Sequence, residues 1–192
     1  MNELLNRRRL SSESQAAQLL KNIDGRRIFV VHRHLGSILH YDLRIEINGV
    51  LKSWAIPKGP SMNAGDRRLA ILTDDLPLDY AKFQGVVPEG TYGAGIVERW
   101  DKGYCIPHAF HNSACGDRDM LCQLKDGRLK FTLRGKKLRG VFSLVRINGN
   151  SQHWLLIKGN DKYAVNDPYN SEHYIASTSI INKFLKRSNA AA

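Results

Sequence analysis

The chain has 192 residues, and its 29 basic and 18 acidic side chains give a formal net charge of +11 at pH 7. This length suits one domain with a sizeable core, and two domains would be cramped. No apolar run approaches the length of a membrane span, and the N-terminus lacks the apolar core of a signal peptide. We therefore expect a cytoplasmic protein without a membrane partner.

The excess of positive charge indicates a polyanionic partner, and nucleic acid is the natural candidate. The basic residues occur in small clusters, among them residues 7–9, 67–68 and 136–139. A basic surface that serves only solubility is the alternative interpretation.

Residues 1–24 form a polar, basic N-terminal arm, in which Ser12 followed by Gln15 fits a capping box and predicts a short helix. We expect residues 25–170 to form the main domain and residues 171–192 to form a C-terminal helix and tail. The stretch STSIINKFLKR in that tail has its apolar residues on one side, which predicts a helix that covers an end of the main domain.

Residues 29–54, FVVHRHLGSILHYDLRIEINGVLKSW, hold the densest group of chemically active side chains. The alternation in residues 40–47 predicts a β-strand. His40, Asp42 and Arg44 fall on one face of that strand, and the residues between them are apolar or aromatic. One face is therefore predicted to serve chemistry and the other packing.

The stretch before this strand, RIFVVHRH, predicts a partner strand with His32 and His34 on the same side. Gly36 and Ser37 can turn the chain between the two strands. Residues 48–49, Asn-Gly, suit a type I′ hairpin into a third strand, VLKSWAI.

Two imidazoles and a carboxylate that meet at one point, here His34, His40 and Asp42, can hold a divalent ion such as Mn, Fe or Zn. Arg44 would lie beside that ion, where its guanidinium fits a pair of phosphate oxygens. The alternative is a set of polar residues on the solvent-exposed face of an antiparallel sheet.

Short alternating segments separated by Gly, Pro, Asn and Asp run through residues 28–165, as in RLKFTLRG, RGVFSLVRI and HWLLIKG. This pattern is typical of a mainly β protein, built as an antiparallel barrel or sandwich.

Ordered blocks across residues 28–164 resemble a known family, the 3′-phosphoesterase module found at the head of bacterial ligase D polypeptides and as free-standing archaeal and bacterial proteins. The blocks are FVVHRH, LHYDLRIEINGVLKSWAIPKGPS, DRRLAI, PLDYAKFQGVVPEGTYGAG, WDKG, GRLKFTLRGKKLRGVFSLVR and HWLLIK. The resemblance implies a compact antiparallel β-barrel with a polar interior groove and short N- and C-terminal helices. It also implies Mn²⁺, and removal of phosphate or ribonucleoside from the 3′ end of a primer strand in non-homologous end joining.

The implied partners are DNA or RNA-terminated DNA 3′ ends, together with a separate ligase or polymerase of an end-joining system. The resemblance implies catalytic roles for His40, Asp42, Arg44 and Tyr80. It implies substrate contacts for Glu13, Lys58, Arg68, Asp74 and His32. Asp74 stands where the family usually has glutamate, and His32 stands where it often has glutamine. Leu76 occupies the place of a family histidine that contacts phosphate. His32 either replaces that hydrogen-bond donor or has only a packing role.

A cysteine-containing stretch between WDKG and GRLKF reads as a loop and offers a second, weaker metal site. Cys105, His108, His111 and Cys115 could together bind a structural Zn²⁺, although their spacing is not that of a standard finger. The odd number of cysteines and the expected compartment disfavour a disulfide.

Two other classes of protein fit part of the pattern. His40 and Asp42 followed far downstream by His153 also describe the metal triad of Fe(II) oxygenases. A non-catalytic nucleic-acid-binding module that has lost turnover through Leu76 is the other alternative.

Overall fold

The computed structural model describes residues 26–108, 116–148 and 150–190. Within these ranges the strands are β1 Arg27–Leu35, β2 Leu39–Ile47, β3 Val50–Ile56, β4 Arg67–Pro77, β5 Gly85–Val87, β6 Gly95–Pro107, β7 Arg128–Arg134, β8 Arg139–Arg146 and β9 His153–Lys158. The helices are η1 Leu78–Lys82, α2 Gly116–Lys125, η2 Ser171–Tyr174 and α3 Ile180–Ala190. No helix among the described residues is long and apolar enough to cross a membrane.

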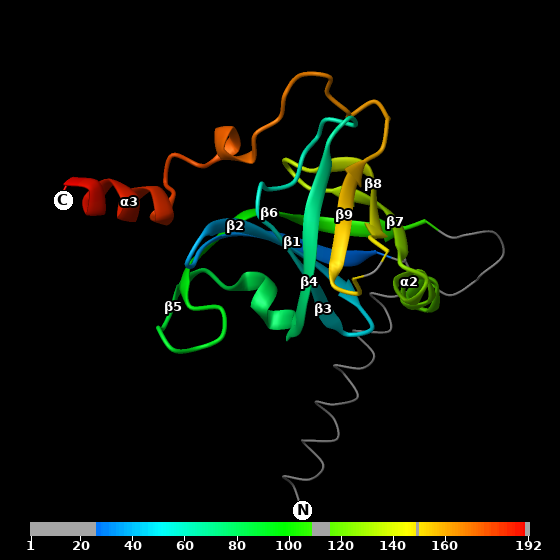
Figure 1. Ribbon diagram of the computed structural model, residues 1–192, viewed down its shortest axis with the longest axis horizontal. Coiled ribbons are helices and arrows are strands. Elements are labelled where there is room, and N and C mark those ends of the chain that lie inside the picture. The colour runs from blue at the N-terminus through cyan, green and yellow to red at the C-terminus, as the bar shows by residue number, and fades with distance from the viewer. Residues whose placement is uncertain (1–25, 109–115, 149, 191–192) are drawn as a thin grey trace, which may run out of the picture.

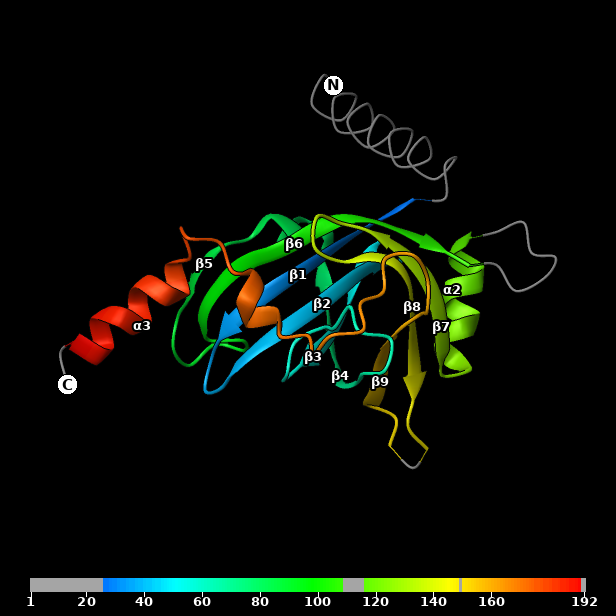
Figure 2. The ribbon, with the colours of Figure 1, turned by 90° about the horizontal axis from the view of Figure 1, so that it is seen from above.

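The strands form one antiparallel sheet in the order β1-β2-β3-β4-β9-β8-β7-β6-β5, which closes through an additional pairing of β1 with β6. Eight strands therefore make a closed barrel, and β5 is added to the outside of the ring along β6. Figures 1 and 2 show β1 between β2 and β6. The predicted mainly β barrel is confirmed.

The hairpin between β2 and β3 is the predicted one. Asn48 has a φ of 53° and Gly49 a φ of 79°, both in the left-handed region that a type I′ turn requires. This turn pairs Arg44 with Ser53, while β1 pairs His32 with Asp42 and His34 with His40.

The interior of the barrel is apolar. Its core contains Phe29, Leu43, Trp54, Phe131 and Trp154, which come from strands all around the ring. Because side chains alternate along a strand, His40, Asp42 and Arg44 point away from this core, to the outer face of β2. The polar groove that the resemblance implies for the interior lies on this outer face instead.

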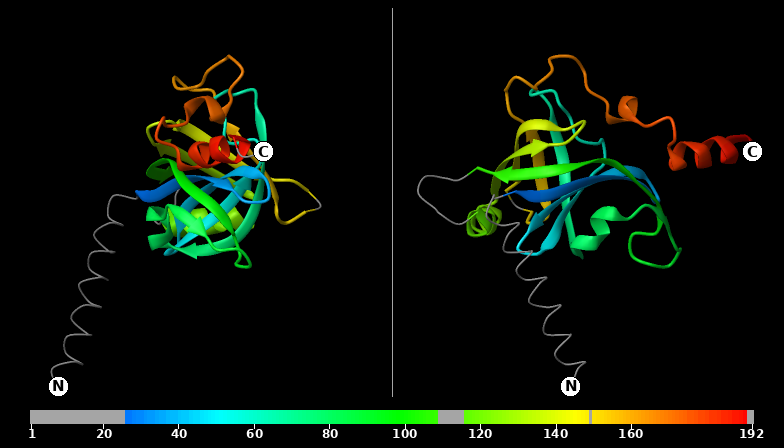
Figure 3. Two further views of the ribbon diagram at one scale, coloured as in Figure 1. Left: turned by 90° about the vertical axis from the view of Figure 1, so that its left-hand side faces the viewer. Right: turned by 180° about the vertical axis from the view of Figure 1, so that it is seen from behind.

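The C-terminal segment is attached to the barrel through Glu98. The carboxylate of Glu98 on β6 accepts hydrogen bonds from Ser179 Oγ and from the backbone N–H of Ile180, each at 2.9 Å. Ile181 is fully buried, whereas half of Phe184 is exposed. Figures 1 and 3 show α3 extending away from the barrel, so the prediction that this helix covers a barrel end is wrong beyond its first turn.

The predicted N-terminal helix and arm lie outside the described residues. The domain boundaries at residues 24/25 and 170/171 stay predictions.

Candidate active site

A groove of about 680 Å³ lies on the outer face of β1 to β4, and the chain from η1 to the start of β6 lines its other side. Its polar residues are His34, Ser37, His40, Asp42, Arg44, Thr73 and Asp74, and its larger apolar or aromatic residues are Leu76, Tyr80, Phe83, Val86 and Tyr92. The wall formed by β1 to β4 is therefore mainly polar, with Leu76 as an exception, and the opposite wall, from Tyr80 to Tyr92, is apolar or aromatic.

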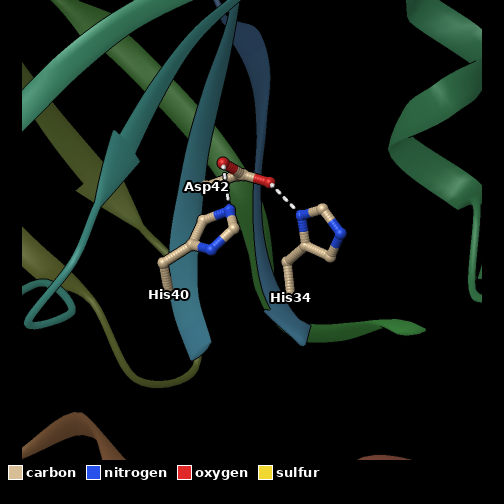
Figure 4. Close-up of side chains that lie close together, drawn as sticks. All are labelled: His34, His40 and Asp42. Carbon is tan, nitrogen blue, oxygen red and sulfur yellow. Dashed lines mark ion pairs between the residues drawn. The ribbon is translucent and has the colours of Figure 1, made fainter. Parts of the chain in front are cut away.

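His34, His40 and Asp42 form a cluster at the polar wall, where their candidate ligand atoms all lie within 4.8 Å of one another. Nδ1 of His34 is 3.5 Å from Oδ2 of Asp42, and Nε2 of His40 is 3.6 Å from Oδ1. Figure 4 shows the two rings, from β1 and β2, on either side of the carboxylate. Asp42 and His34 are buried and His40 is half-buried, so this face is not the solvent-exposed surface of the alternative interpretation.

The second nitrogen of each imidazole contacts a backbone carbonyl oxygen. Nδ1 of His40 lies 2.8 Å from the carbonyl oxygen of Ile38, and Nε2 of His34 lies 3.2 Å from that of Ala94. A carbonyl oxygen only accepts hydrogen bonds, so the imidazole nitrogens that contact the carbonyls carry the protons. In a neutral imidazole the other nitrogen, here the one that faces Asp42, then carries a lone pair. Lone pairs aimed at a carboxylate repel it unless a cation lies between them, and carbonyl-anchored imidazoles are typical of metal ligands. The three residues therefore fit a divalent metal.

Asp42 is suited to remain an anion. Burial alone would raise the pKa of its carboxyl group, but its neighbours His34, Arg44 and His40 hold that pKa below its usual value.

Arg44 is held by three hydrogen bonds at the floor of the groove. Its Nε donates to Nδ1 of His32 at 3.3 Å, its Nη1 to Oγ of Ser53 at 2.8 Å and its Nη2 to Asp42 at 2.9 Å. The guanidinium also lies over the ring of Tyr80, 5.2 Å from its centroid. A guanidinium has five N–H donors. One hydrogen on Nη1 and one on Nη2 remain, which is the pair that a bidentate contact with phosphate uses.

The predicted site residues fall into two places. Asp74, Leu76 and Tyr80 line the same groove as the cluster. Lys58 and Arg68 line a second pocket beside the start of β2, where Nη2 of Arg68 bonds Asp66 and the carbonyl oxygen of Tyr169. Glu13 lies outside the described residues.

His32 does not reach the groove surface. Its exposed fraction is 0%, and burial, assisted by the charge of Arg44, lowers its pKa to about 3. It is therefore a neutral acceptor that orients Arg44, and in this geometry it does not contact a phosphate.

The other proposed metal ligands are not gathered among the described residues. Cys105 lies on β6, not in a loop, with its side chain fully buried, and burial raises the pKa of its thiol. His111 and Cys115 lie outside the described residues, so the zinc site stays a prediction. His153 begins β9 and pairs with Ile71. It does not belong to the group of His40 and Asp42, which an Fe(II) triad would require.

Sequence reasoning missed several groups at the site, among them Ser53, the Ala94 carbonyl and Tyr92. The register set by the turn at residues 48–49 predicts that Ser53 lies opposite Arg44. No local signal identifies the Ala94 carbonyl or Tyr92, because their positions depend on a fold-back of residues far from His34 in the sequence.

Fold and site together define a closed antiparallel β-barrel with a candidate metal centre on its outer face. Residues 32–146 match the DNA ligase D 3′-phosphoesterase domain, and the chain belongs to this family. The resemblance noted in the sequence is therefore confirmed.

Similar proteins include multifunctional non-homologous end joining proteins LigD. The protein from Pseudomonas aeruginosa is 41% identical over 155 residues, which are 80% of this chain and 17% of that protein. The protein from Mycobacterium tuberculosis is 39% identical over 127 residues, 66% of this chain and 15% of that protein. The protein from Mycolicibacterium smegmatis is 34% identical over 140 residues, 70% of this chain and 17% of that protein. The chain thus spans about a sixth of the length of these relatives.

Proposed function

We propose that this chain is a Mn²⁺-dependent phosphoesterase that removes 3′-phosphate, 3′-terminal ribonucleoside or both from nucleic-acid primer strands during DNA end repair. The observation that carries this proposal is the buried Arg44, with two N–H donors to spare, beside two carbonyl-anchored imidazoles that face a carboxylate. Membership of the 3′-phosphoesterase domain family supports the same reaction class.

His34, His40 and Asp42 would hold the metal. When bound there, a divalent ion supplies Lewis-acid polarisation of a non-bridging phosphate oxygen. Manganese suits a set of two imidazoles and a carboxylate, as do iron and zinc.

Arg44 grips a second phosphate oxygen through its remaining Nη hydrogens and stabilises the negative charge that develops as phosphorus is attacked. Its three fixed contacts hold the guanidinium in place before substrate arrives, so little reorganisation is needed in the reaction.

Tyr80 is the second donor that we assign to the phosphate. Burial raises the pKa of its hydroxyl group, which keeps it protonated and able to donate a hydrogen bond. Its ring stacks on Phe83 at 5.0 Å and supports the guanidinium of Arg44. Asp74, in the same groove, is suited to a hydroxyl group of the terminal sugar.

The substrate that we propose is the 3′ end of DNA or of RNA-terminated DNA. The formal charge of +11 favours a polyanion, and Lys58 and Arg68 offer positive charge in a pocket next to the groove for a phosphate further along the strand. Because the relatives are named as multifunctional end joining proteins, we further propose a ligase or polymerase of such a system as a partner.

The experiment that tests the proposal supplies a 3′-phosphate primer–template and Mn²⁺ and measures inorganic phosphate. A second primer, ending in a ribonucleotide, reports release of the terminal nucleoside. We expect turnover that EDTA abolishes and Mn²⁺ restores. Binding of both primers without any release would identify a non-catalytic nucleic-acid-binding module instead.

A further inference from the structure

We propose that Tyr92, together with Val86, forms a stacking surface for the base of the 3′-terminal nucleotide. The site would then recognise a nucleotide and not only a phosphate group. This inference rests on the proposed function, because it assigns the substrate's terminal base to the apolar wall of the same groove.

Two apolar side chains on this wall are unusually exposed. Tyr92 has an exposed fraction of 72% and Val86 one of 70%, and both line the groove that holds the His34, His40 and Asp42 cluster. An exposed aromatic side chain that lines a groove offers a flat apolar face to a ligand. Exposed apolar surface beside a polar cluster is typical of a binding site.

The loop that carries Tyr92 is fixed with respect to the cluster. The hydroxyl group of Thr91 donates to the carbonyl oxygen of Pro88 at 2.6 Å, and the N–H of Ala94 donates to the carbonyl oxygen of Thr91 at 3.1 Å. The Ala94 carbonyl then accepts from Nε2 of His34. Tyr92 is therefore only two positions before Ala94, the residue whose carbonyl oxygen contacts a candidate metal ligand.

Gly95 makes this close approach possible. Its φ is +131°, and an added Cβ would lie 2.2 Å from the carbonyl oxygen of Leu35. The loop can therefore pack against the end of β1 only with glycine at this position.

The size and composition of the groove indicate what occupies its apolar half. A volume of about 680 Å³ falls in the range of about 300 to 1,000 Å³ that holds drug-sized ligands, and a phosphate fills a small part of it. Arg44 and the cluster account for the phosphate. Bases are the flat apolar parts of a nucleic acid, and single-stranded ends place them on aromatic side chains.

The test compares two 3′-phosphate primers that differ only in the last nucleotide, which is either natural or abasic. KM, kcat and the dissociation constant are measured for the wild type, Tyr92→Ala and Tyr92→Phe. Tyr163→Ala is the matched control, since Tyr163 is also exposed, by 40%, and does not line the groove. Thermal melts check that each variant is folded.

We expect Tyr92→Ala to raise KM and the dissociation constant for the natural primer roughly 5- to 150-fold, the range that one stacked base supplies. We expect kcat to change little, the abasic primer to be insensitive to the substitution, and Tyr92→Phe to behave as the wild type. Equal effects of Tyr92→Ala on the two primers, or none on either, would overturn the stacking surface. Failure of the proposed function looks different, because the wild type would then release no product while the dissociation constants still report stacking.

Discussion

Nε of Arg44 donates a hydrogen bond to Nδ1 of His32 across 3.3 Å, from β2 to β1 beneath the groove. His32→Ala removes this acceptor and leaves a cavity next to the guanidinium. Because a hydrogen bond to a charged group contributes about 1.5 to 3 kcal/mol, we expect kcat to fall roughly 10- to 100-fold. Phosphate release from a 3′-phosphate primer measures the loss.

His32→Gln is the matched variant, since its amide oxygen can accept from the same Nε. It should recover most of the activity. A His32→Gln variant as impaired as His32→Ala would mean that His32 does more than orient Arg44.

His40→Ala and Asp42→Ala should both abolish metal-dependent turnover, but they should differ in stability. The His40 side chain is 24% exposed, so we expect its removal to change the free energy of unfolding by less than about 1 kcal/mol. Asp42 is buried against Arg44, and its loss leaves a buried charge with one partner fewer, which should cost about 1 to 3 kcal/mol. Denaturant melts compare the two, and wild-type activity of either variant with Mn²⁺ would contradict the metal assignment.

Leu76→His places an imidazole in the lining of the groove, where the family pattern has histidine. One donor at an anionic transition state is worth on the order of 100- to 1,000-fold in rate, so we expect at least about a tenfold gain in phosphate release. Leu69→His is the control, because Leu69 is exposed on the same strand and does not line the groove. Equal rates for the two variants would show that position 76 does not touch the phosphate.

Glu172→Gln tests the ion pair that ties η2 to the barrel. Nε and Nη2 of the buried Arg33 donate hydrogen bonds to the two carboxylate oxygens of Glu172, at 2.8 and 2.6 Å. Burial acts to raise the pKa of Glu172, but the hydrogen bonds from Arg33 and Tyr41 outweigh it and lower that pKa. We expect the variant to lose about 1 to 2 kcal/mol at pH 7, a modest value because Glu172 is partly exposed.

A lowered carboxyl pKa gives stability that is present above the unfolded-state pKa, near 4.3, and that disappears as pH falls through the folded-state value. The stability difference between the wild type and Glu172→Gln should therefore shrink below about pH 4. Urea melts from pH 3 to 7 measure it, and a difference that stays constant with pH would argue against the ionised pair.

The barrel and the grouping of His34, His40 and Asp42 could be predicted because both depend on local pattern. Alternation in residues 40–47 places the side chains of Asp42 and Leu43 on opposite faces of β2. The Asn48–Gly49 turn fixes the register between β2 and β3. The same register pairs Arg44 with Ser53 on β3.

Features set by long-range contacts could not be read from the sequence. The outer-face position of the groove depends on residues 78–94 folding back onto β1, and no local signal aims Ala94 at His34. The family resemblance implies substrate contacts for Lys58 and Arg68, and these two residues line a pocket separate from the groove. The stretch between WDKG and GRLKF reads as a loop, but the pairing of Cys105 with Leu133 continues β6 through this cysteine.

Strand β1, which carries His34, is protected from solvent by strands on both sides. This strand is hydrogen-bonded on one side to β2 and on the other to β6, and residues 29–34 are buried whichever face they point to. Amides in such a strand exchange with solvent deuterium only when the whole barrel unfolds. The amides of the strand that bears His34 should therefore be among the slowest to exchange even in metal-free protein. Folding of the barrel alone would then position His34, and metal binding would not be needed for it.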